Sequence, residues 1–229
     1  PEIKALWQEE KLPIVVGGTG LYIDNLVNGT TPIPETSKKA HEETIALLKE
    51  IGVQALHKKL KKVDKESFER LSENDTTRIR RAYEVWLDTG IPLSVWHKKA
   101  LINKLPEAKY FIIKIVPSQK ELDERCYKRF DKMIEQGAIK EVEKLVAQKI
   151  DKSKPAMKAL GVPELMEYIM GITSLDEAVK AAKLHTRQYA KRQLTWFKAK
   201  LKADFEISKC YQTDNNLLKN IIFNVKKQL

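Results

Sequence analysis

The sequence of 229 residues is 42% hydrophobic and 32% charged, and its 42 Lys and Arg against 31 Asp and Glu give a formal net charge of +11. This composition supports a folded core and excludes a wholly disordered chain, and the absence of ~18 consecutive apolar residues excludes a membrane-spanning helix. The positive charge favours polyanionic partners, such as nucleic acid, an acidic membrane surface or a phosphorylated ligand.

The first distinctive element is an apolar, β-branched run at residues 13–16, which predicts a buried strand of a parallel sheet. The glycine-rich turn after it, residues 17–20, lets a backbone approach closely at the strand end where open α/β sheets bind ligands. One further convincing strand is expected at residues 110–116 and a weaker one at 204–207. Because these are too few for a stable parallel sheet, we expect more strands to precede residue 1.

A helical stretch lies between the predicted strands. Prolines 32 and 34 form a linker, and Thr36 or Ser37 can cap a helix that stops at Gly52. Short helices are expected at residues 53–63 and 65–71. Asn74 or Asp75 can cap another helix that ends at Gly90, with an apolar stripe formed by Ile79, Ala82, Tyr83 and Trp86. We expect residues 34–106 to form an all-helical subdomain inserted into an α/β core of residues 1–33 and 107–229.

The rest of the core is predicted to be mainly helical. Ser118 and Glu121 form a capping box for a helix that ends at Gly137, and its inward side chains are expected to be Leu122, Cys126, Phe130 and Met133. Two shorter helices follow, at residues 139–148 and from Pro163 to Gly171. A second capping box, Ser174 with Glu177, begins the longest helix, which runs to about residue 202 and is ~40 Å long.

Basic charge is concentrated on that longest helix, since residues 178–203 contain no acidic residue. The spacing places Lys180, Lys183, Arg187 and Lys191 on one face, while Val179, Ala182, Tyr189 and Phe197 can face the core. A polyanion lying along this face would explain the unbalanced charge, and arginine matches phosphate oxygens in two-point geometry. The alternative is a solvated lysine-rich face.

Two smaller basic clusters occur on other predicted helices. Arg78, Arg80 and Arg81 lie early on a helix, where free backbone N–H groups also attract anions. The alternative is ion pairing with Asp75 and Glu84, which we favour for Arg80 taken alone. The other cluster is Arg125, Lys128 and Arg129.

The two cysteines, Cys126 and Cys210, stand far apart without a CxxC neighbour. This spacing excludes a disulfide framework and a zinc ribbon, and it is typical of a reducing compartment. No charged-then-apolar leader opens the sequence, so we expect a cytoplasmic protein without a membrane partner.

Several motifs together carry a family resemblance. They are residues 13–22, residues 74–85, Arg129-Phe130 with Met133, Gly137 and Glu141-Val142, residues 159–164, and residues 186–197, in this order. From about residue 11 to residue 207 the chain resembles the tRNA dimethylallyltransferase family, also called tRNA isopentenyltransferases or IPP transferases. The resemblance implies a fold related to phosphate-loop kinases, with a helical insertion that binds the tRNA anticodon stem-loop.

The resemblance also implies transfer of a dimethylallyl group from dimethylallyl diphosphate to N6 of adenosine 37 in tRNA, assisted by Mg²⁺. The target base would be flipped into a channel shared with the diphosphate. We expect a monomer that takes these two substrates.

Carried over position by position, the resemblance implies catalytic roles for Thr19, which contacts tRNA at the channel, and for Arg129. Arg129 and Arg187 would bind the diphosphate. The residues implied in tRNA binding, besides Thr19, are His41, Thr77, Arg78, Ile79, Arg80, Arg81, Arg187, Lys191, Arg192 and Gln193.

The sequence departs from the family pattern in two places. The family opens with a GxxxxGK[ST] phosphate loop, followed shortly by an aspartate that acts as general base, and no such loop occurs here. We therefore expect that the N-terminal phosphate-loop segment is missing, that the chain holds no metal ligands itself, and that this fragment is inactive alone. The second departure is Gly161-Val162, where the family often has Gly-Tyr.

Other functions remain open from the residues alone. The basic helices would also suit a tRNA- or nucleic-acid-binding module without catalysis. A prenyltransferase acting on free adenine nucleotides is another alternative, although it would not need the subdomain at residues 34–106. A small-molecule kinase that shares the core is more remote.

Overall fold

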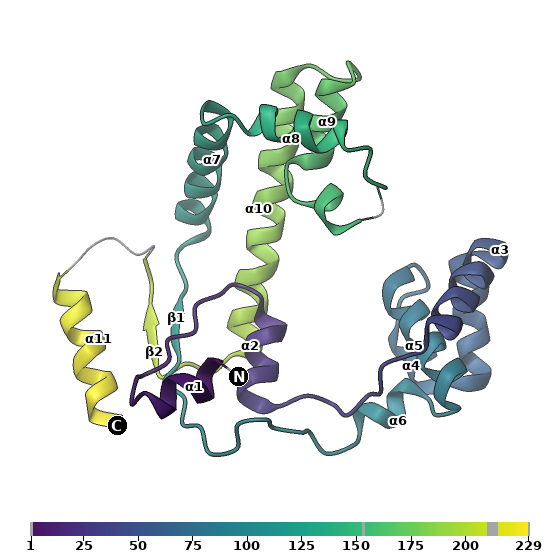
Figure 1. Ribbon diagram of the computed structural model, residues 1–229, viewed down its shortest axis with the longest axis horizontal. Helices are drawn as coiled ribbons and strands as arrows, with labels where there is room; N and C mark the ends of the chain where they lie inside the picture. The colour runs from purple at the N-terminus through teal and green to yellow at the C-terminus, as the bar shows by residue number, and fades with distance from the viewer. Residues whose placement is uncertain (1, 153, 210–214, 229) are drawn as a thin grey trace. The chain divides into compact units, whose positions relative to one another are not determined.

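Figure 1 shows the computed structural model of the chain, in which residues 2–152, 154–209 and 215–228 are described. The chain divides into two compact units, Pro1–Leu21 with Lys109–Leu229 and Tyr22–Ala108. The second unit contains residues 34–106, which the sequence assigns to a helical subdomain. None of the helices in the described ranges is both long enough and apolar enough to cross a membrane.

The unit at Tyr22–Ala108 is helical. Its elements are most of α2 (Gly20–Asn28), then α3 (Lys38–Val63), α4 (Lys65–Arg70), α5 (Thr76–Thr89) and α6 (Leu93–His97). The core forms where α3 packs on α5, and its buried residues are Leu56, Leu60, Ile79, Ala82, Val85 and Leu93. The apolar stripe predicted for α5 is therefore confirmed at Ile79 and Ala82, and Val85 extends it.

Local signals set the helix boundaries in this unit as the sequence predicts. Ser37 caps α3 by accepting a hydrogen bond from the Ala40 amide, and Asp75 caps α5 in the same way. Gly90 ends α5 in the left-handed region that glycine adopts most readily. Gly52, with φ of 77°, kinks α3, whose helical hydrogen bonding resumes beyond it. The break expected at Gly52 is therefore confirmed, because the backbone leaves the helical region at this residue and α3 consists of two helical segments on either side of it.

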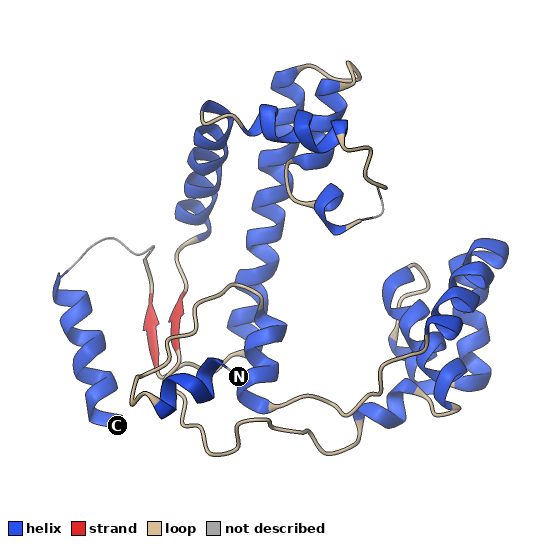
Figure 2. Cartoon of the chain, viewed as in Figure 1, coloured by secondary structure: helices blue, strands red, loops and turns tan. Residues whose placement is uncertain are grey.

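The other unit combines helices with a small sheet (Figure 2). Its helices are α1 (Glu2–Gln8), α7 (Gln119–Glu135), α8 (Ala138–Ala147), a 3₁₀ turn (Pro155–Lys158), α9 (Val162–Ile169), α10 (Leu175–Lys200) and α11 (Asn215–Gln228). Ser118 caps α7, and the capping box of Ser174 with Glu177 begins α10, as the sequence predicts. One core of this unit lies between α8 and α9 around Val142, Met157, Leu165 and Met166.

The sheet of the described chain has two parallel strands, β1 (Ile113–Ile115) and β2 (Phe205–Ile207). Lys114 lies opposite Glu206 in the register, and their side chains form an ion pair of 2.5 Å. The buried Lys114 ammonium also donates to the carbonyl oxygen of Leu201. Both strands were expected from the sequence, and β1 is shorter than the predicted range of 110–116.

The strand predicted at residues 13–16 is wrong for this structure. Residues 11–17 carry no regular secondary structure, and Ile14 and Val16 are 80% and 89% exposed. A β-strand needs a neighbour to accept and donate its backbone hydrogen bonds. In the described residues β1 and β2 pair with each other, and neither pairs with this segment.

Helix α10 packs against α7 and α9 through a row of small side chains. The buried residues repeat every fourth position, which places them on one face: Ala178, Ala182, Thr186, Ala190 and Leu194. The expectation that Tyr189 faces the core is wrong, because its side chain is 40% exposed. On α7, Cys126 and Phe130 are buried as predicted, but Met133 is 38% exposed.

Candidate functional site

The glycine-rich turn at residues 17–20 lies against the C-terminal half of α10. The side-chain amide of Gln193 donates a 2.8 Å hydrogen bond to the carbonyl oxygen of Gly18. A Cβ added at Gly20 would lie 2.1 Å from the Trp196 ring, so only glycine permits this approach. Thr19, between these two contacts, is exposed. The structure thus places Thr19 beside the α10 segment that also carries predicted RNA-binding residues.

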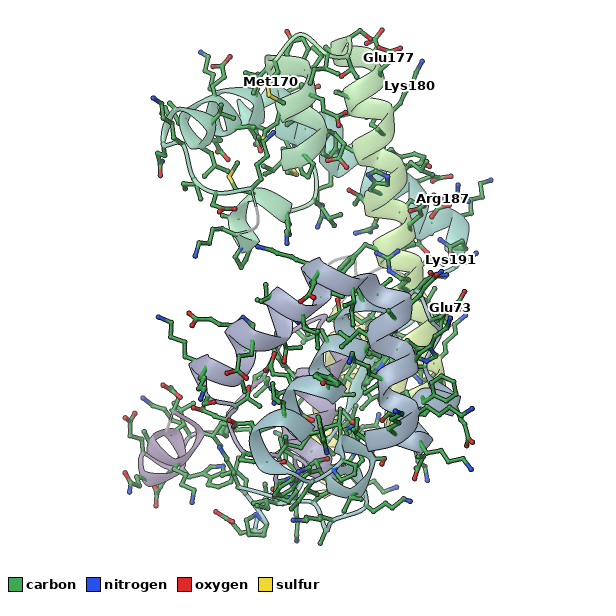
Figure 3. All side chains as sticks on the ribbon, turned by 90° about the vertical axis from the view of Figure 1, so that its right-hand side faces the viewer. Glu73, Met170, Glu177, Lys180, Arg187 and Lys191 are labelled. Atoms are coloured by element: carbon green, nitrogen blue, oxygen red, sulfur yellow. The ribbon has the colours of Figure 1, made fainter. Side chains whose placement is uncertain are left out.

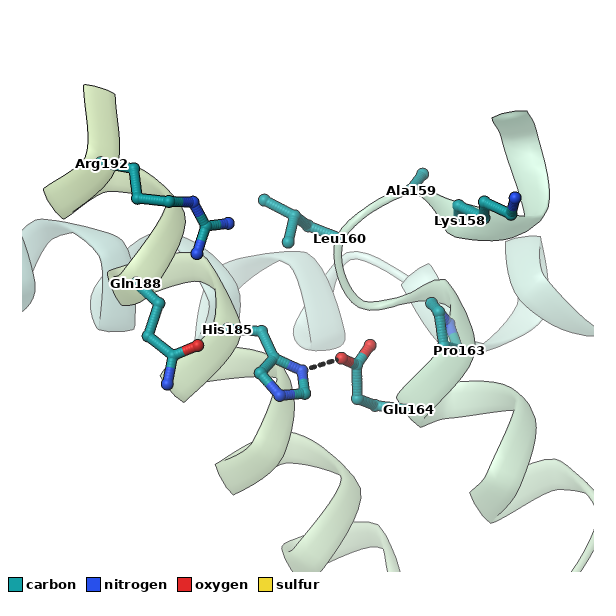
Figure 4. A pocket seen from close by; sticks show the side chains of 8 residues that line it. All are labelled: Lys158, Ala159, Leu160, Pro163, Glu164, His185, Gln188 and Arg192. Atoms are coloured by element: carbon teal, nitrogen blue, oxygen red, sulfur yellow. Dashed lines mark hydrogen bonds and ion pairs between the residues drawn. The ribbon is translucent and has the colours of Figure 1, made fainter. Parts of the chain in front are cut away.

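Two pockets lie along α10. One, of about 380 Å³, is open and follows the helix surface; its lining residues are Lys191, Arg192, Thr195, Trp196, Ala199 and Lys200. The other, of about 340 Å³, lies between α10 and the segment that leads into α9. Figure 4 shows its lining: Lys158, Ala159, Leu160, Pro163, Glu164, His185, Gln188 and Arg192. Arg192 borders both pockets and also lies over the ring of Tyr189.

A buried carboxylate forms part of the second pocket's wall. Glu164 is 8% exposed, and His185 Nδ1 hydrogen-bonds to its Oε1 (Figure 4). Its other oxygen, Oε2, is buried and has no hydrogen-bond partner among the described residues. The pocket wall thus holds one buried carboxylate, and its lining also includes the basic residues Lys158 and Arg192, which lie at opposite ends of the view in Figure 4.

The basic face predicted on α10 is partly neutralised by α7. Arg187 Nε lies 2.8 Å from Asp123 Oδ2, and Lys183 Nζ lies 2.5 Å from Asp131 Oδ1 and over the ring of Tyr127. Half of the predicted stripe thus has acidic partners inside the fold. Figure 3 shows Lys180, Arg187 and Lys191 along one side of the helix. Arg187 is still 44% exposed, with only Nε engaged in that ion pair.

Arg129 lies on α7 and is exposed. Its neighbour Phe130 is buried against the backbone of Gly161, the glycine at the start of α9. Burial raises the pKa of the Cys126 thiol, and the positive charge of Arg129 partly opposes this rise. Arg129 and Arg187, the two residues expected to bind diphosphate, line neither of the two pockets described above.

In the helical unit, two predicted RNA-binding residues meet at one buried carboxylate. Glu84 is 4% exposed and accepts hydrogen bonds from Thr36 Oγ1 at 2.5 Å, His41 Nδ1 at 2.9 Å and Arg81 Nη1 at 2.8 Å. Burial acts to raise the pKa of Glu84, but these hydrogen bonds outweigh it and lower the pKa below its ordinary value. Arg81 Nη1 also donates to Thr36.

The other members of the α5 cluster have different surroundings. Arg78 forms an exposed 2.6 Å ion pair with Asp75, and Thr77 is exposed. Ile79 is fully buried in the core, so its side chain is not available to tRNA, and the contact expected at this position stays a prediction for its backbone. Arg80 makes no ion pair with the described residues, although pairing was favoured for it, and its Nε is buried without a partner.

Comparison with known proteins identifies the family. The family model for IPP transferase matches residues 1–200. The tRNA dimethylallyltransferase of Rhodospirillum centenum is 39% identical over 226 residues, which cover 98% of this chain and 72% of that protein. This chain belongs to the IPP transferase family. The resemblance seen in the sequence motifs is therefore confirmed.

Further IPP transferase relatives give the same result. The tRNA dimethylallyltransferase of Granulibacter bethesdensis is 41% identical over 84% of this chain and 60% of its own length. The solved tRNA delta(2)-isopentenylpyrophosphate transferase of Staphylococcus epidermidis is 32% identical, with a TM-score of 0.61 over 100% of this chain and 73% of that one. A solved eukaryotic dimethylallyltransferase that acts on tRNA is 24% identical, with a TM-score of 0.74 over 96% of this chain and 57% of that one, and shows the shared fold. The α/β class of phosphate-loop type predicted from the sequence is confirmed.

Within this family member, sequence reasoning missed three residues that shape the site. Glu84 was considered only as an ion-pair partner, whereas it joins His41 to Arg81. Glu164 lies in the quoted motif of residues 159–164 but was given no role, and His185 was not noticed. Glu84 and Glu164 share one signal, a charged residue at a buried position, which becomes informative only once its partners are known.

The described residues contain no group of three or more His, Cys, Asp or Glu that could hold a metal ion.

Proposed function

We propose that this chain binds the tRNA anticodon stem-loop and dimethylallyl diphosphate for transfer of the dimethylallyl group to N6 of adenosine 37. The relatives named above support this assignment. The observation that carries it is the contact of the turn around Thr19 with Gln193 and Trp196, because it joins two family motifs that are far apart in sequence.

The transfer reaction requires that the negative charge of the departing diphosphate be stabilised. The carbon–oxygen bond of the allylic diphosphate breaks, the adenosine N6 forms a bond to the allylic carbon, and N6 loses a proton to a base. Cationic groups near the departing diphosphate stabilise its developing negative charge. We assign this role to Arg129 and Arg187, whose guanidinium groups match phosphate oxygens in two-point geometry.

The RNA is proposed to contact both units. In one, the exposed side chains of Lys191 and Arg192 line the α10 pockets, and Thr19 lies on the turn that contacts Gln193 and Trp196 of the same helix. In the other, His41, Thr77 and the α5 arginines Arg78, Arg80 and Arg81 would contact the anticodon stem-loop. We further propose that the protein acts as a monomer in the cytoplasm.

The test is direct binding followed by transfer. A tRNA anticodon stem-loop should bind the chain with an affinity that falls steeply with salt, because phosphate contacts release counterions. Labelled dimethylallyl diphosphate should also bind. Because the phosphate loop and the aspartate base of the family do not occur in this sequence, we expect no transfer by this chain alone. Failure to bind either substrate at low salt would contradict the proposal, and RNA binding without donor binding would favour a non-catalytic RNA-binding module.

A further inference from the structure

A buried carboxylate connects the start of α3 to α5 in the helical unit. The Glu84 side chain is 5% exposed, yet the groups bonded to it are partly in solvent, since His41 is 43% and Arg81 is 40% exposed. A buried charge is unfavourable unless it is paired and hydrogen-bonded. Glu84 meets this condition with one donor from the segment before α3, one from α3 and one from α5.

The cluster leaves donors facing outward. Arg81 uses Nη1 for both Thr36 and Glu84, and its Nε and Nη2 donate to none of the described residues. His41 uses Nδ1, and Nε2 has no partner among the described residues. The Arg81 guanidinium is therefore fixed at Nη1 while Nε and Nη2 stay available to an acceptor, and the His41 ring is fixed at Nδ1. Such fixed donors lose less conformational freedom when they bind a phosphate than freely rotating ones do.

We propose that Glu84 is a positioning residue for RNA binding, which holds His41 and Arg81 in one arrangement while the free donors of Arg81 contact the phosphate backbone. The inference rests on the proposed function, because it assumes that this unit binds the anticodon stem-loop. Glu84 itself does not contact RNA in this arrangement. It acts through Arg81, His41 and Thr36.

A matched control lies one helical turn further along α5. Asp88 also holds the start of α3, by accepting from the Ser37 amide at 3.0 Å and the Ser37 hydroxyl at 2.5 Å. Among the described residues, the Asp88 carboxylate forms no hydrogen bond or ion pair with His41 or Arg81. The variants Glu84→Gln and Asp88→Asn therefore each remove one negative charge from the same face of α5, at a buried and an exposed position, but only the first disturbs His41 and Arg81.

The direction in which the Kd for RNA changes in Glu84→Gln distinguishes a positioning role from a simple charge effect. Removing a negative charge from an RNA-binding surface should tighten binding if charge alone matters. The positioning role predicts the opposite: Glu84→Gln should raise the Kd for an anticodon stem-loop about tenfold, as expected for the loss of an oriented charge-assisted contact. Asp88→Asn should change the Kd less than about twofold. All variants are compared well below their unfolding midpoints, by filter binding at matched salt.

Two further variants make the result independent of how well Glu84→Gln folds. Thr36→Val keeps the Glu84 charge but removes the hydroxyl that bonds both Glu84 and Arg81, and should weaken binding in the same direction. Arg81→Ala combined with Glu84→Gln should weaken binding by less than the sum of the two single effects, because Glu84 acts partly through Arg81. Any loss beyond that of Arg81→Ala alone measures the part that Glu84 exerts through His41.

The outcomes are distinguishable. If the wild-type chain binds RNA, and Glu84→Gln and Thr36→Val bind it equally well or more tightly, the positioning role is overturned. The proposed function would stand in that case. Equal weakening by Asp88→Asn and Glu84→Gln would also overturn the positioning role, since general loosening of α3 would then suffice. No RNA binding by the wild-type chain would overturn the proposed function and the positioning role with it.

Discussion

The side-chain amide of Gln193 donates a hydrogen bond to the carbonyl oxygen of Gly18, a residue 175 positions earlier in the chain. Trp196, on the next turn of α10, packs against the backbone of Gly20. These two contacts hold the turn that carries Thr19 on the helix that carries Lys191 and Arg192. The arrangement of the proposed site in this unit therefore depends on how closely the glycine turn approaches α10.

The contact between Gly20 and Trp196 predicts that a larger side chain at position 20 lowers the stability of this unit. Gly20→Ala would place a Cβ within the Trp196 ring, at 2.1 Å from Cε3, and should destabilise this unit by about 1–3 kcal/mol, as overpacking does. Without that clash, alanine would instead stabilise the first turn of α2. Thermal unfolding followed by tryptophan fluorescence measures the change. Gly17→Ala is the control, since nothing lies within 4 Å of its added Cβ; an equal effect at both positions would contradict the packing argument.

The two ion-paired arginines of α5 should behave differently. Arg78→Ala and Arg81→Ala should each weaken stem-loop binding and reduce the salt slope by about 1, as expected when one phosphate contact is lost. Only Arg81→Ala should also lower the unfolding free energy, because it leaves the buried Glu84 with fewer partners. Arg78 pairs with Asp75 at the surface, where such pairs contribute little.

Filter-binding titrations at several salt concentrations, together with urea unfolding, measure both effects. Lys59→Ala removes an exposed charge from the same unit and should leave the salt slope unchanged. Unchanged slopes for both arginine variants would remove this helix from the RNA interface.

Arg129 is predicted to act on the prenyl donor. Arg129→Ala should raise the Kd for dimethylallyl diphosphate about tenfold, since hydrogen bonds to charged groups contribute roughly 1.5–3 kcal/mol. The Kd for the stem-loop should change far less. Calorimetric titration of each ligand measures the two constants, with Lys128→Ala as the control for loss of an adjacent exposed charge. Equal effects on both ligands would refute the assigned role.

Asp64 should make the helical unit sensitive to acid. It is 2% exposed and accepts hydrogen bonds from the amides of Ser67 and Ser94 and from the Ser67 hydroxyl. Burial acts to raise the pKa of Asp64, but these hydrogen bonds lower it below the ordinary value of 3.8. A lowered pKa in the folded state stabilises the fold above the unfolded-state value, and this stability is lost as the pH falls through the folded-state value.

The Asp64→Asn variant tests this linkage. It should be less stable than wild type near neutral pH, and the difference should shrink as the pH falls below about 4. Urea unfolding at a series of pH values measures it. Glu73→Gln, an exposed residue of the same unit, should change the unfolding free energy by less than about 0.5 kcal/mol at neutral pH. A pH-independent difference for Asp64→Asn would show that its charge is not involved.

Features that depend only on residues adjacent in the sequence could be predicted without the structure. Ser37, Asp75, Ser118 and Ser174 begin helices where expected, because a cap needs only the next three residues of the chain. The assignment of helix faces was less reliable. Tyr189 fits an apolar face by spacing, but α10 packs on α7 and α9 through a row of smaller residues instead.

Charge partners could not be predicted, because they come from other elements. The sequence shows that residues 178–203 lack acidic residues, but not that Asp123 and Asp131 on α7 pair with Arg187 and Lys183. Nor does spacing show that one carboxylate, Glu84, joins His41 to Arg81 across two helices.

The amino-acid order alone thus determined the family, the helices with their caps, and the set of basic residues suited to a polyanion, because motifs and caps are local. The tertiary structure decided which of these cations are already paired, which residues are buried as Ile79 is, and that residues 13–16 have no strand partner in the described chain. The burial of a side chain and the pairing of a charge depend on contacts between residues far apart in sequence, which only the folded chain brings together.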